Sequence, residues 1–201
     1  MKVLIACEFS GIVRDAFSRM GHNAWSCDLL PTEKPGFHIK GDILKHLNDD
    51  WDLMVAHPPC TYLANSGVRW LYGGKGSVKD ANRWRDMEEA ARFFRLLLDA
   101  PIPQIAIENP IMHRYAREII GRGHDQLVQP WGFGEPEIKA TCFWLKGLPP
   151  LQHTNIVEGR KPRVHHASPG PDRWKERSRT LQGIADAMVD QWGASLAVAA
   201  E

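Results

Sequence analysis

The feature that most constrains the fold of this chain is an alternation of short, largely apolar runs with segments of helical periodicity. The runs lie at residues 2–7, 51–56 and 104–107, and helical patterns follow them at 11–20, 79–100 and 111–120. Short apolar runs are typical of strands buried on both faces. Strands that alternate with helices imply parallel strands joined by crossover helices. We therefore predict an α/β fold with an open, mostly parallel, doubly wound sheet.

The chain is long enough to fold without covalent or metal support. Its 201 residues correspond to one domain, and a chain of this length buries roughly 70% of its unfolded surface. The four cysteines lie far apart, without a Cys-x-x-Cys pair, which favours reduced thiols over a disulfide framework or a zinc site. The first apolar run ends at Glu8, too early for a signal peptide, and no run approaches the length of a membrane span. We expect a cytoplasmic protein with no metal site and no membrane partner.

Positive charge is concentrated near the C-terminus. The net charge is +1, but residues 160–179 hold seven Lys or Arg against two acidic residues, a local charge of +5. Segregated positive charge favours a phosphate backbone as partner, although a solvated loop has the same composition. We divide the chain into a catalytic core (1–148 and 180–193), a Pro-rich basic segment (149–179) and a C-terminal tail (194–201).

Acidic or sharply turning residues follow the predicted strands, and ligands bind at the carboxyl ends of strands in open parallel sheets. The turn Phe9-Ser10-Gly11 opens the first helix, which we expect Ser10 to cap. Asp28 ends the next strand about 20 residues later, where a carboxylate can accept hydrogen bonds from ribose hydroxyls. The Phe9-Ser10-Gly11 turn and Asp28 together indicate a cofactor that contains a nucleoside. Other strand ends carry Gly41-Asp42, Pro58-Pro59-Cys60 and Glu108-Asn109.

Cys60 and Glu108 are the candidate catalytic residues. Two prolines stiffen the chain before Cys60 and aim its side chain, although a lone cysteine is often a small buried apolar residue. Glu108 ends an apolar strand, where burial is costly unless the carboxyl is paired or protonated. A carboxyl beside a thiol suits a pyrimidine, because it can hydrogen-bond to the ring nitrogen and amine while the thiolate attacks the adjacent carbon. The next segment, 61–79, has the Gly, Arg and aromatic content of a mobile lid.

The order of these motifs resembles the cytosine-5 DNA methyltransferase family, in a short form like that of phage and prophage homologues. The resemblance covers residues 2–192 in collinear order. Five stretches resemble its motifs: Phe9-Ser10-Gly11 the first cofactor motif, Asp28 the ribose-binding acid, Gly41-Asp42-Ile43 the adenine-binding motif, Pro59-Cys60 the nucleophile motif, and Glu108-Asn109 the Glu-Asn-Val motif. Residues 183–188 occupy the place of the last cofactor motif.

The resemblance implies a Rossmann-like S-adenosylmethionine-dependent methyltransferase fold and a known type of reaction. The Cys60 thiolate would add to carbon 6 of cytosine, Glu108 would stabilise the protonated ring, and carbon 5 would take the methyl group. In duplex DNA the base must first be flipped out of the stack. The resemblance also assigns Phe9, Ser10, Gly11, Asp28, Asp42 and Pro59 to cofactor binding.

The chain departs from the family pattern at four places. Thr61 stands where Gln usually follows the cysteine, and His57-Pro58 replaces Gly-Phe. Lys139 is the nearest cation to the family's Gln-x-Arg-x-Arg motif. The long target-recognition domain is missing, so we expect weak sequence specificity or a protein partner that supplies it. Phosphate contacts are then expected from Arg69, Lys75, Arg173, Lys175 and Arg177.

Four other interpretations stay open. One has a carboxylated S-adenosylmethionine as donor, which would leave carboxymethylcytosine and would need a nearby cation such as Arg14, Arg69 or Lys139. Another has a free pyrimidine nucleotide as substrate, as in thymidylate synthase-like enzymes. Methylation of an exocyclic amine fits poorly, because His57 and Cys60 stand at the ends of the Pro-Pro motif. A catalytically silent DNA-binding protein would retain the fold without needing Cys60 and Glu108. The adjacent His165 and His166 are not spaced to hold a metal.

Overall fold

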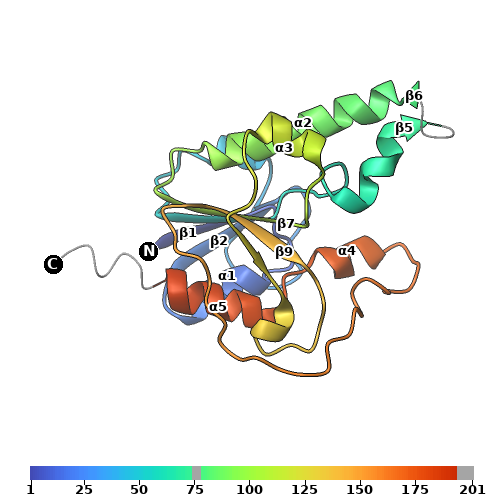
Figure 1. Ribbon diagram of the computed structural model, residues 1–201. Coiled ribbons are helices and arrows are strands. Elements are labelled where there is room, and N and C mark those ends of the chain that lie inside the picture. Colours follow the sequence, from blue (N-terminus) through green and yellow to red (C-terminus); the bar gives the residue numbers. More distant parts are fainter. Residues whose placement is uncertain (74–77, 194–201) are drawn as a thin grey trace.

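The computed structural model describes residues 1–73 and 78–193, and its centre is a seven-stranded sheet (Figure 1). The strand order is β3-β2-β1-β4-β7-β9-β8. The first five strands in that order run parallel, and β9 is antiparallel to both of its neighbours. The bounds are β1 Lys2–Ala6, β2 Asn23–Asp28, β3 His38–Lys40, β4 Leu53–Ala56, β7 Gln104–Asn109, β8 Gln126–Val128 and β9 Thr141–Lys146. The protein is therefore an α/β protein with a mostly parallel, Rossmann-like sheet.

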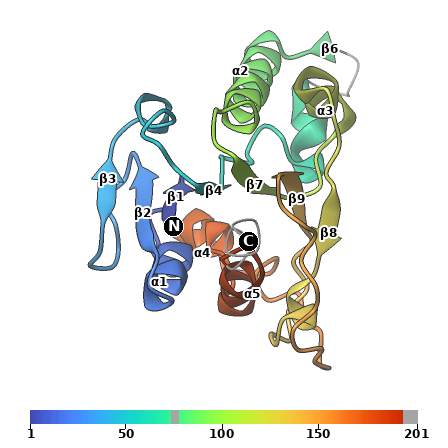
Figure 2. The ribbon, with the colours of Figure 1, turned by 90° about the vertical axis from the view of Figure 1, so that its left-hand side faces the viewer.

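Helices cover both faces of the sheet, as Figure 2 shows. One face carries α2 (Ala81–Leu98) and α3 (Arg114–Ile120), and the other carries α1 (Ile12–Arg19) and α5 (Gln182–Trp192). The alternation within β1 follows from this: Leu4 packs in the core under α2 and α3, and Val3 and Ile5 pack in the core under α1 and α5. All three are fully buried. A strand covered on both faces reads as a continuous apolar run, as the sequence indicated.

The remaining elements are short. They comprise the 3-10 helices Ile43–Lys45, Asn65–Leu71 and Pro130–Gly132, the small hairpin of β5 (Tyr72–Gly73) and β6 (Val78–Lys79), and α4 (Arg173–Ser178). No helix in residues 1–73 and 78–193 has the length and apolar character needed to cross a membrane.

The predicted core elements all form, with ends that differ by up to three residues from those the periodicity suggested: the helices are shorter, and β7 extends two residues beyond the predicted run. The first helix was expected to start at Gly11 under a Ser10 cap, but it starts at Ile12, with Gly11 at the N-cap position in a left-handed conformation (φ 72°). The predicted basic segment contains α4, which the sequence did not indicate. The predicted tail, 194–201, lies outside the described residues.

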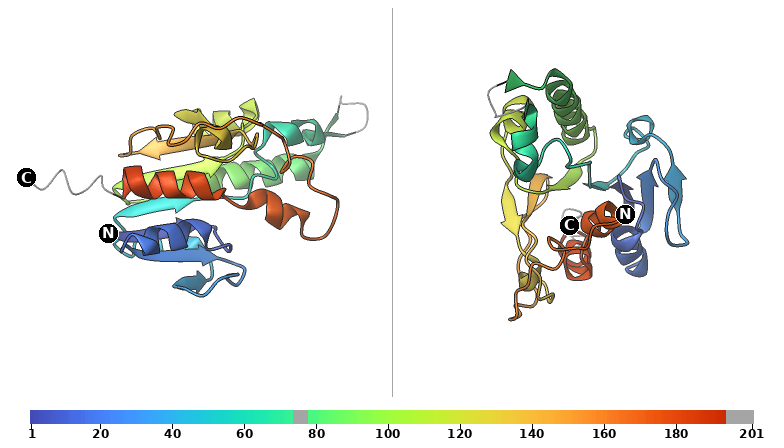
Figure 3. Two further views of the ribbon diagram at one scale, coloured as in Figure 1. Left: turned by 90° about the horizontal axis from the view of Figure 1, so that it is seen from below. Right: turned by 90° about the vertical axis from the view of Figure 1, so that its right-hand side faces the viewer.

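The sheet has a topological switch point between β1 and β4. These two strands are neighbours, but the chain leaves β1 toward α1 on one face and leaves β4 toward α2 on the other. The turns that follow them therefore separate and leave a crevice at the carboxyl ends, which is the ordinary ligand site of open α/β sheets. Figure 3 shows α4 on the side to which the parallel strands point.

Candidate functional site at the carboxyl edge of the sheet

The loop after β1 is tied to the start of α1 by Glu8. This side chain is 5% exposed, and its carboxylate accepts hydrogen bonds from the backbone N–H groups of Val13 (2.8 Å) and Arg14 (3.2 Å). The Ser10 hydroxyl donates to the same carboxylate at 3.1 Å and accepts from the N–H of Ile12 at 3.3 Å. Glu8 thus satisfies the helix N-terminus, where a negative charge is also favoured by the helix dipole.

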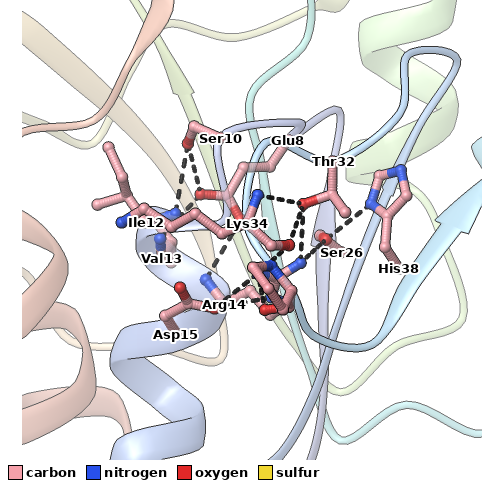
Figure 4. A network of polar contacts seen from close by, with 11 residues as sticks. Glu8, Ser10, Ile12, Val13, Arg14, Asp15, Ser26, Thr32, Lys34 and His38 are labelled. Atoms are coloured by element: carbon pink, nitrogen blue, oxygen red, sulfur yellow. Dashed lines mark hydrogen bonds and ion pairs between the residues drawn. The ribbon is translucent and has the colours of Figure 1, made fainter.

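Arg14 holds the loop that follows β2 (Figure 4). Its side chain is only 1% exposed, and all three guanidinium nitrogens donate hydrogen bonds. The acceptors are the side chains of Asp15, Ser26 and Thr32 and the carbonyls of Lys34 and Pro35. A Cβ at Gly11 or Gly36 would lie 2.5–2.9 Å from this guanidinium. Arg14 is therefore fully used by the fold, and among the cations considered for a carboxylated donor it is not available.

Asp28 ends β2, and Asp42 follows the adjacent strand β3 by two residues. Asp28 accepts from the N–H of Leu30 at 2.9 Å, and burial raises the pKa of its carboxyl above the ordinary value. Asp42 is exposed and accepts from the N–H of Leu44 at 3.0 Å. Burial and the charges of both acids raise the pKa of the Cys27 thiol to about 11, so each carboxylate lies within electrostatic reach of this thiol. This pair offers acceptors to the hydroxyls and amine of a nucleoside.

Cys60 is the most accessible thiol in the described part of the chain: Cys27 and Cys142 are buried and Cys7 is half-buried. It stands four residues beyond β4, after a turn that Asn109 fixes by donating a 2.9 Å hydrogen bond to the carbonyl of Pro58. Glu108 lies on β7, the strand next to β4, and its side chain is 12% exposed. The turn after β4 and the end of β7 therefore present Cys60 and Glu108 to one place.

The charges around Cys60 and Glu108 are coupled. Burial raises the pKa of the Cys60 thiol and the Glu108 carboxylate raises it further, while Lys139 and Arg177 oppose that rise. Burial also raises the pKa of Glu108, but a hydrogen bond from His57 and the positive charge of Lys139 outweigh it and hold this pKa below its ordinary value. Glu108 is thus an anion at neutral pH beside a protonated thiol.

His57 joins this group. It follows β4 directly, its side chain is 8% exposed, and its Nδ1 lies 3.4 Å from Oε2 of Glu108. Its Nε2 is buried with no hydrogen-bond partner among the described residues. The sequence offered His57 only as a departure from a motif. A histidine directly after a buried strand was the signal available for it.

Residues 172–180, which we call the strap, lie over the carboxyl edge of β1 and β4. The Trp174 ring contacts the Phe9 ring at 5.8 Å, and the Lys139 ammonium donates to the carbonyl of Arg179 at 2.8 Å. The strap closes a cavity of about 40 Å³ lined by Cys7, Glu8, Phe9, Ser10, His57, Ser178, Arg179 and Thr180. A complete nucleoside donor needs a pocket of roughly 300–1,000 Å³, so it enters only when the strap shifts.

The residues predicted to bind phosphate lie in different settings. Arg69 is exposed on the 3-10 helix Asn65–Leu71, 4.6 Å from the Trp70 ring, and Lys75 lies outside the described residues. Arg173 donates to the carbonyls of Ala167 and His165, and Lys175 pairs with Asp172. Only Arg177 influences the Cys60 thiol from the strap. The structure thus places Lys139 and Arg177 near Cys60, whereas Arg69 lies apart from them on the 3-10 helix Asn65–Leu71.

Comparison with known proteins adds no assignment to this site. No protein-family model matches the sequence, and no curated protein matches it significantly. A functional proposal for the chain therefore depends on its own residues and their geometry.

Proposed function

We propose that this protein is a transferase that modifies cytosine at carbon 5 in DNA, with S-adenosylmethionine as donor. Cys60 is the nucleophile and Glu108 binds the cytosine ring. The observation that carries the proposal is the accessible Cys60 thiol beside the ionised, 12% exposed Glu108 carboxylate, at the carboxyl ends of adjacent parallel strands. Within the resemblance to cytosine-5 methyltransferases, these are the two residues that the chemistry requires.

The reaction follows from these two groups. The Cys60 thiol loses its proton to water, Sγ bonds to carbon 6 of cytosine, and the carbon 5–carbon 6 π electrons move to carbon 5 while the ring nitrogen takes up a proton from water. Glu108 accepts hydrogen bonds from the exocyclic amine and from the protonated ring nitrogen, which stabilises this addition. Carbon 5 takes the methyl carbon while the electron pair of the donor's bond returns to sulfur. Loss of the carbon 5 proton to water reforms the double bond and expels the Cys60 thiolate.

Lys139 acts on the nucleophile rather than on the base. Its positive charge lowers the pKa of both Cys60 and Glu108, so it favours the thiolate and keeps the carboxylate ionised. Among the described residues it is the cation that influences both groups. This agrees with its place near the position of the family's arginine motif, where a cation is expected.

The residues at the edge of β1, β2 and β3 fit a nucleoside donor. Asp28 and Asp42 offer carboxylate oxygens, and Phe9 after β1 and Pro59 after β4 are apolar residues of the same carboxyl edge. The donor supplies the methyl group. The chain supplies acceptors for its ribose and adenine, and the strap excludes water from the site when closed. A carboxylated donor remains a variant of the same proposal. Arg69 and Lys139 are then the remaining candidate cations, and of these two Lys139 is the one that acts on Cys60.

We propose DNA as the substrate because Lys139 and the strap residue Arg177 bring positive charge to Cys60, and Arg69 adds an exposed cation outside this group. These cations are suited to bind phosphates, and phosphate contacts do not distinguish one base from another. Sequence specificity is therefore weak or comes from a protein partner. A free nucleotide would need no such spread of charge.

The test is nucleoside mass spectrometry on plasmid from a methylation-free bacterial host that expresses the chain. Cys60→Ser is the test variant and Cys27→Ser, a buried thiol, is the matched control. We expect a new cytosine-derived nucleoside with the wild type and with Cys27→Ser, and none with Cys60→Ser. Its mass identifies the transferred group. Modification that persists in Cys60→Ser would contradict the proposal and would favour methylation of the exocyclic amine, whereas unmodified DNA with the wild type would favour a nucleotide substrate or a silent DNA-binding protein.

A further inference from the structure

The chain presents a second group of cations beyond Cys60, on a surface that we call the projection: residues 61–73, 78–86 and 111–118. It includes the 3-10 helix Asn65–Leu71, the strands β5 and β6, and the starts of α2 and α3. Figures 1 and 3 show β5 and β6 on the same side of the sheet as α4. The projection holds six Lys or Arg against three acidic residues, so it is positively charged.

Four of the six cations lie against aromatic rings. At 4.3–4.6 Å from the ring centroids, these pairs are Arg69 on Trp70, Lys79 on Trp84, Arg83 on Tyr62 and Arg114 on Tyr115. Within residues 1–73 and 78–193, none of these four cations forms an ion pair with a carboxylate. The nearby Asp80 is used as the N-cap of α2 and accepts from the N–H of Arg83 at 3.0 Å. A cation on a ring keeps its charge and remains able to bind a phosphate.

The basic segment near the C-terminus uses its cations differently. Its ion pairs join Arg163 to Glu137, Lys175 to Asp172, and Arg179 to both Glu33 and Glu176. Arg173 donates to two backbone carbonyls. These cations hold the segment onto the fold, so its composition overstates the charge that it offers to a ligand. The projection is the less neutralised of the two basic surfaces.

Trp70 indicates which form of nucleic acid fits the projection. Its side chain is 57% exposed, with the Arg69 guanidinium over the ring, and it contacts no other aromatic ring in the part of the chain that is described. An exposed ring beside a cation is a stacking surface for an unpaired base. In a duplex the faces of the bases are already stacked on one another, so a single strand is the form that can use this ring.

The projection is joined directly to the proposed catalytic residues. Tyr62 follows Cys60 by two residues, and its carbonyl accepts a 2.8 Å hydrogen bond from Nε2 of His113. Backbone hydrogen bonds also join residues 63–65 to residues 111–113, which follow Glu108 at the end of β7. A strand bound along the projection therefore lies next to the segments that carry Cys60 and Glu108.

We propose that the projection binds single-stranded DNA, with its ring-stacked cations on the phosphates and Trp70 on a base. The inference rests on the proposed function, because it names the form of DNA that brings cytosine to Cys60. It moves the main phosphate contacts from the basic segment, where composition placed them, to the projection. An unpaired cytosine also reaches Cys60 without the cost of leaving a duplex.

The test measures binding to DNA that cannot react at Cys60. Fluorescence anisotropy gives the affinity of the full chain for a labelled oligothymidine and for its duplex with oligodeoxyadenosine, neither of which contains cytosine. We expect the single strand to bind at least ~10-fold more tightly at low salt, since stacking on Trp70 is available to it alone. The affinity should fall as salt rises, because phosphate contacts release counterions.

Two kinds of variant separate charge from stacking. Arg83→Gln and Arg114→Gln should each weaken single-strand binding and lower the slope of log affinity against log salt by about 0.7, since each removes one phosphate contact. Trp70→Ala should weaken binding about tenfold and leave the salt slope unchanged. Arg83→Lys, which keeps the charge, should recover the slope.

The chain offers a matched control for each kind of change. Arg92→Gln removes an exposed cation of α2 that already pairs with Glu88, and Trp174→Ala removes a tryptophan of the strap that is 52% exposed. Both should leave the affinity within about twofold of the wild type, because neither residue belongs to the projection. Thermal melting establishes that every variant is folded.

The outcomes distinguish the inference from the proposed function. Equal affinity for single strand and duplex, or wild-type affinity in Arg83→Gln, Arg114→Gln and Trp70→Ala, would show that the projection is not a single-strand site. A larger loss with Lys175→Gln than with Arg83→Gln would return the phosphate contacts to the strap. Each of these results overturns the inference and leaves the Cys60 chemistry to the plasmid test. If the chain binds neither form of DNA, the inference is wrong and a free nucleotide is favoured as the substrate.

Discussion

The two halves of the carboxyl edge of the sheet differ in how their polar groups are used. Around β1 and β2, Glu8 and Arg14 are buried and donate to or accept from neighbours in the same half of the fold. Around β4 and β7, His57 Nε2 and Asn109 Oδ1 are buried without partners among the described residues, and the residue Cys60 is exposed. Polar groups that a fold satisfies internally stabilise it, and polar groups left unsatisfied at an edge are available to a ligand.

This comparison predicts that changes in the first half reduce stability and changes in the second half alter chemistry. The largest expected effect is that of Arg14→Met. Removing a buried arginine leaves Asp15 and several carbonyl and hydroxyl groups without their donor, so we expect a loss of about 3–5 kcal/mol in the free energy of unfolding. Urea denaturation measures it. Arg92→Met, which removes an exposed i,i+4 pair with Glu88 on α2, is the control and should cost less than about 0.5 kcal/mol. An equal cost for the two variants would contradict the comparison.

The second prediction concerns the reactivity of Cys60. Because the Glu108 charge raises the pKa of this thiol, Glu108→Gln should lower that pKa and increase the thiolate fraction at pH 7.5. Lys139→Met should do the opposite, because its charge lowers the same pKa. Iodoacetamide alkylation as a function of pH measures both changes, and we expect several-fold effects of opposite sign at pH 7.5.

The matched control for this prediction is Glu118→Gln, an exposed change on α3. Its alkylation rate should equal that of the wild type. If Glu108→Gln slowed alkylation, the carboxylate would be acting as a base for the thiol and the assigned electrostatics would be wrong.

The smallest expected effect concerns Asp28 at the end of β2, the exception in the first half, because burial there opposes the charged form of its side chain. Burial raises the pKa of Asp28 in the folded state, so stability falls as the pH rises from the ordinary carboxyl pKa to this raised pKa, and the full loss persists at higher pH. Asp28→Asn keeps an oxygen for the N–H of Leu30 and removes the charge. We expect a gain below about 1 kcal/mol at pH 7, since Asp28 is partly solvated, and no gain once the pH falls below the ordinary carboxyl pKa of about 4. The same variant should weaken binding of S-adenosylhomocysteine. A variant that lost stability at pH 7 would contradict this account.

The sequence predicted the elements whose pattern is strong and local. β1, β4 and β7 are apolar runs, and α2 has apolar residues at helical spacing, so their existence followed from periodicity. The antiparallel order of β9 and the three-residue strand β8 did not, because a strand that short has no period and the direction of pairing depends on distant partners. Helix α4 has six residues, of which Trp174 is the one apolar residue, so its sequence has no apolar periodicity that would predict a helix.

The candidate site could be predicted only in part. Cys60 and Glu108 follow or end predicted strands, which the sequence shows locally. Because the carboxyl ends of parallel strands lie at one edge of the sheet, the two residues could be predicted to lie close together. The contribution of Arg179 depends on how the strap folds back onto β1 and β4, and no local pattern carries that information. The burial of Arg14 could not be predicted from the sequence either, because a charged residue on a short helix ordinarily faces solvent.

The central claim is that Cys60 bonds to carbon 6 of cytosine, and its most direct test is a trap for that bond. Purified protein is incubated with S-adenosylmethionine and DNA that contains 5-fluorocytosine, in which fluorine prevents the final elimination. We predict a stable protein–DNA adduct, mapped to the Cys60 peptide by mass spectrometry and absent in Cys60→Ser. If cytosine modification is measured in parallel with no adduct at Cys60, the proposed mechanism is contradicted.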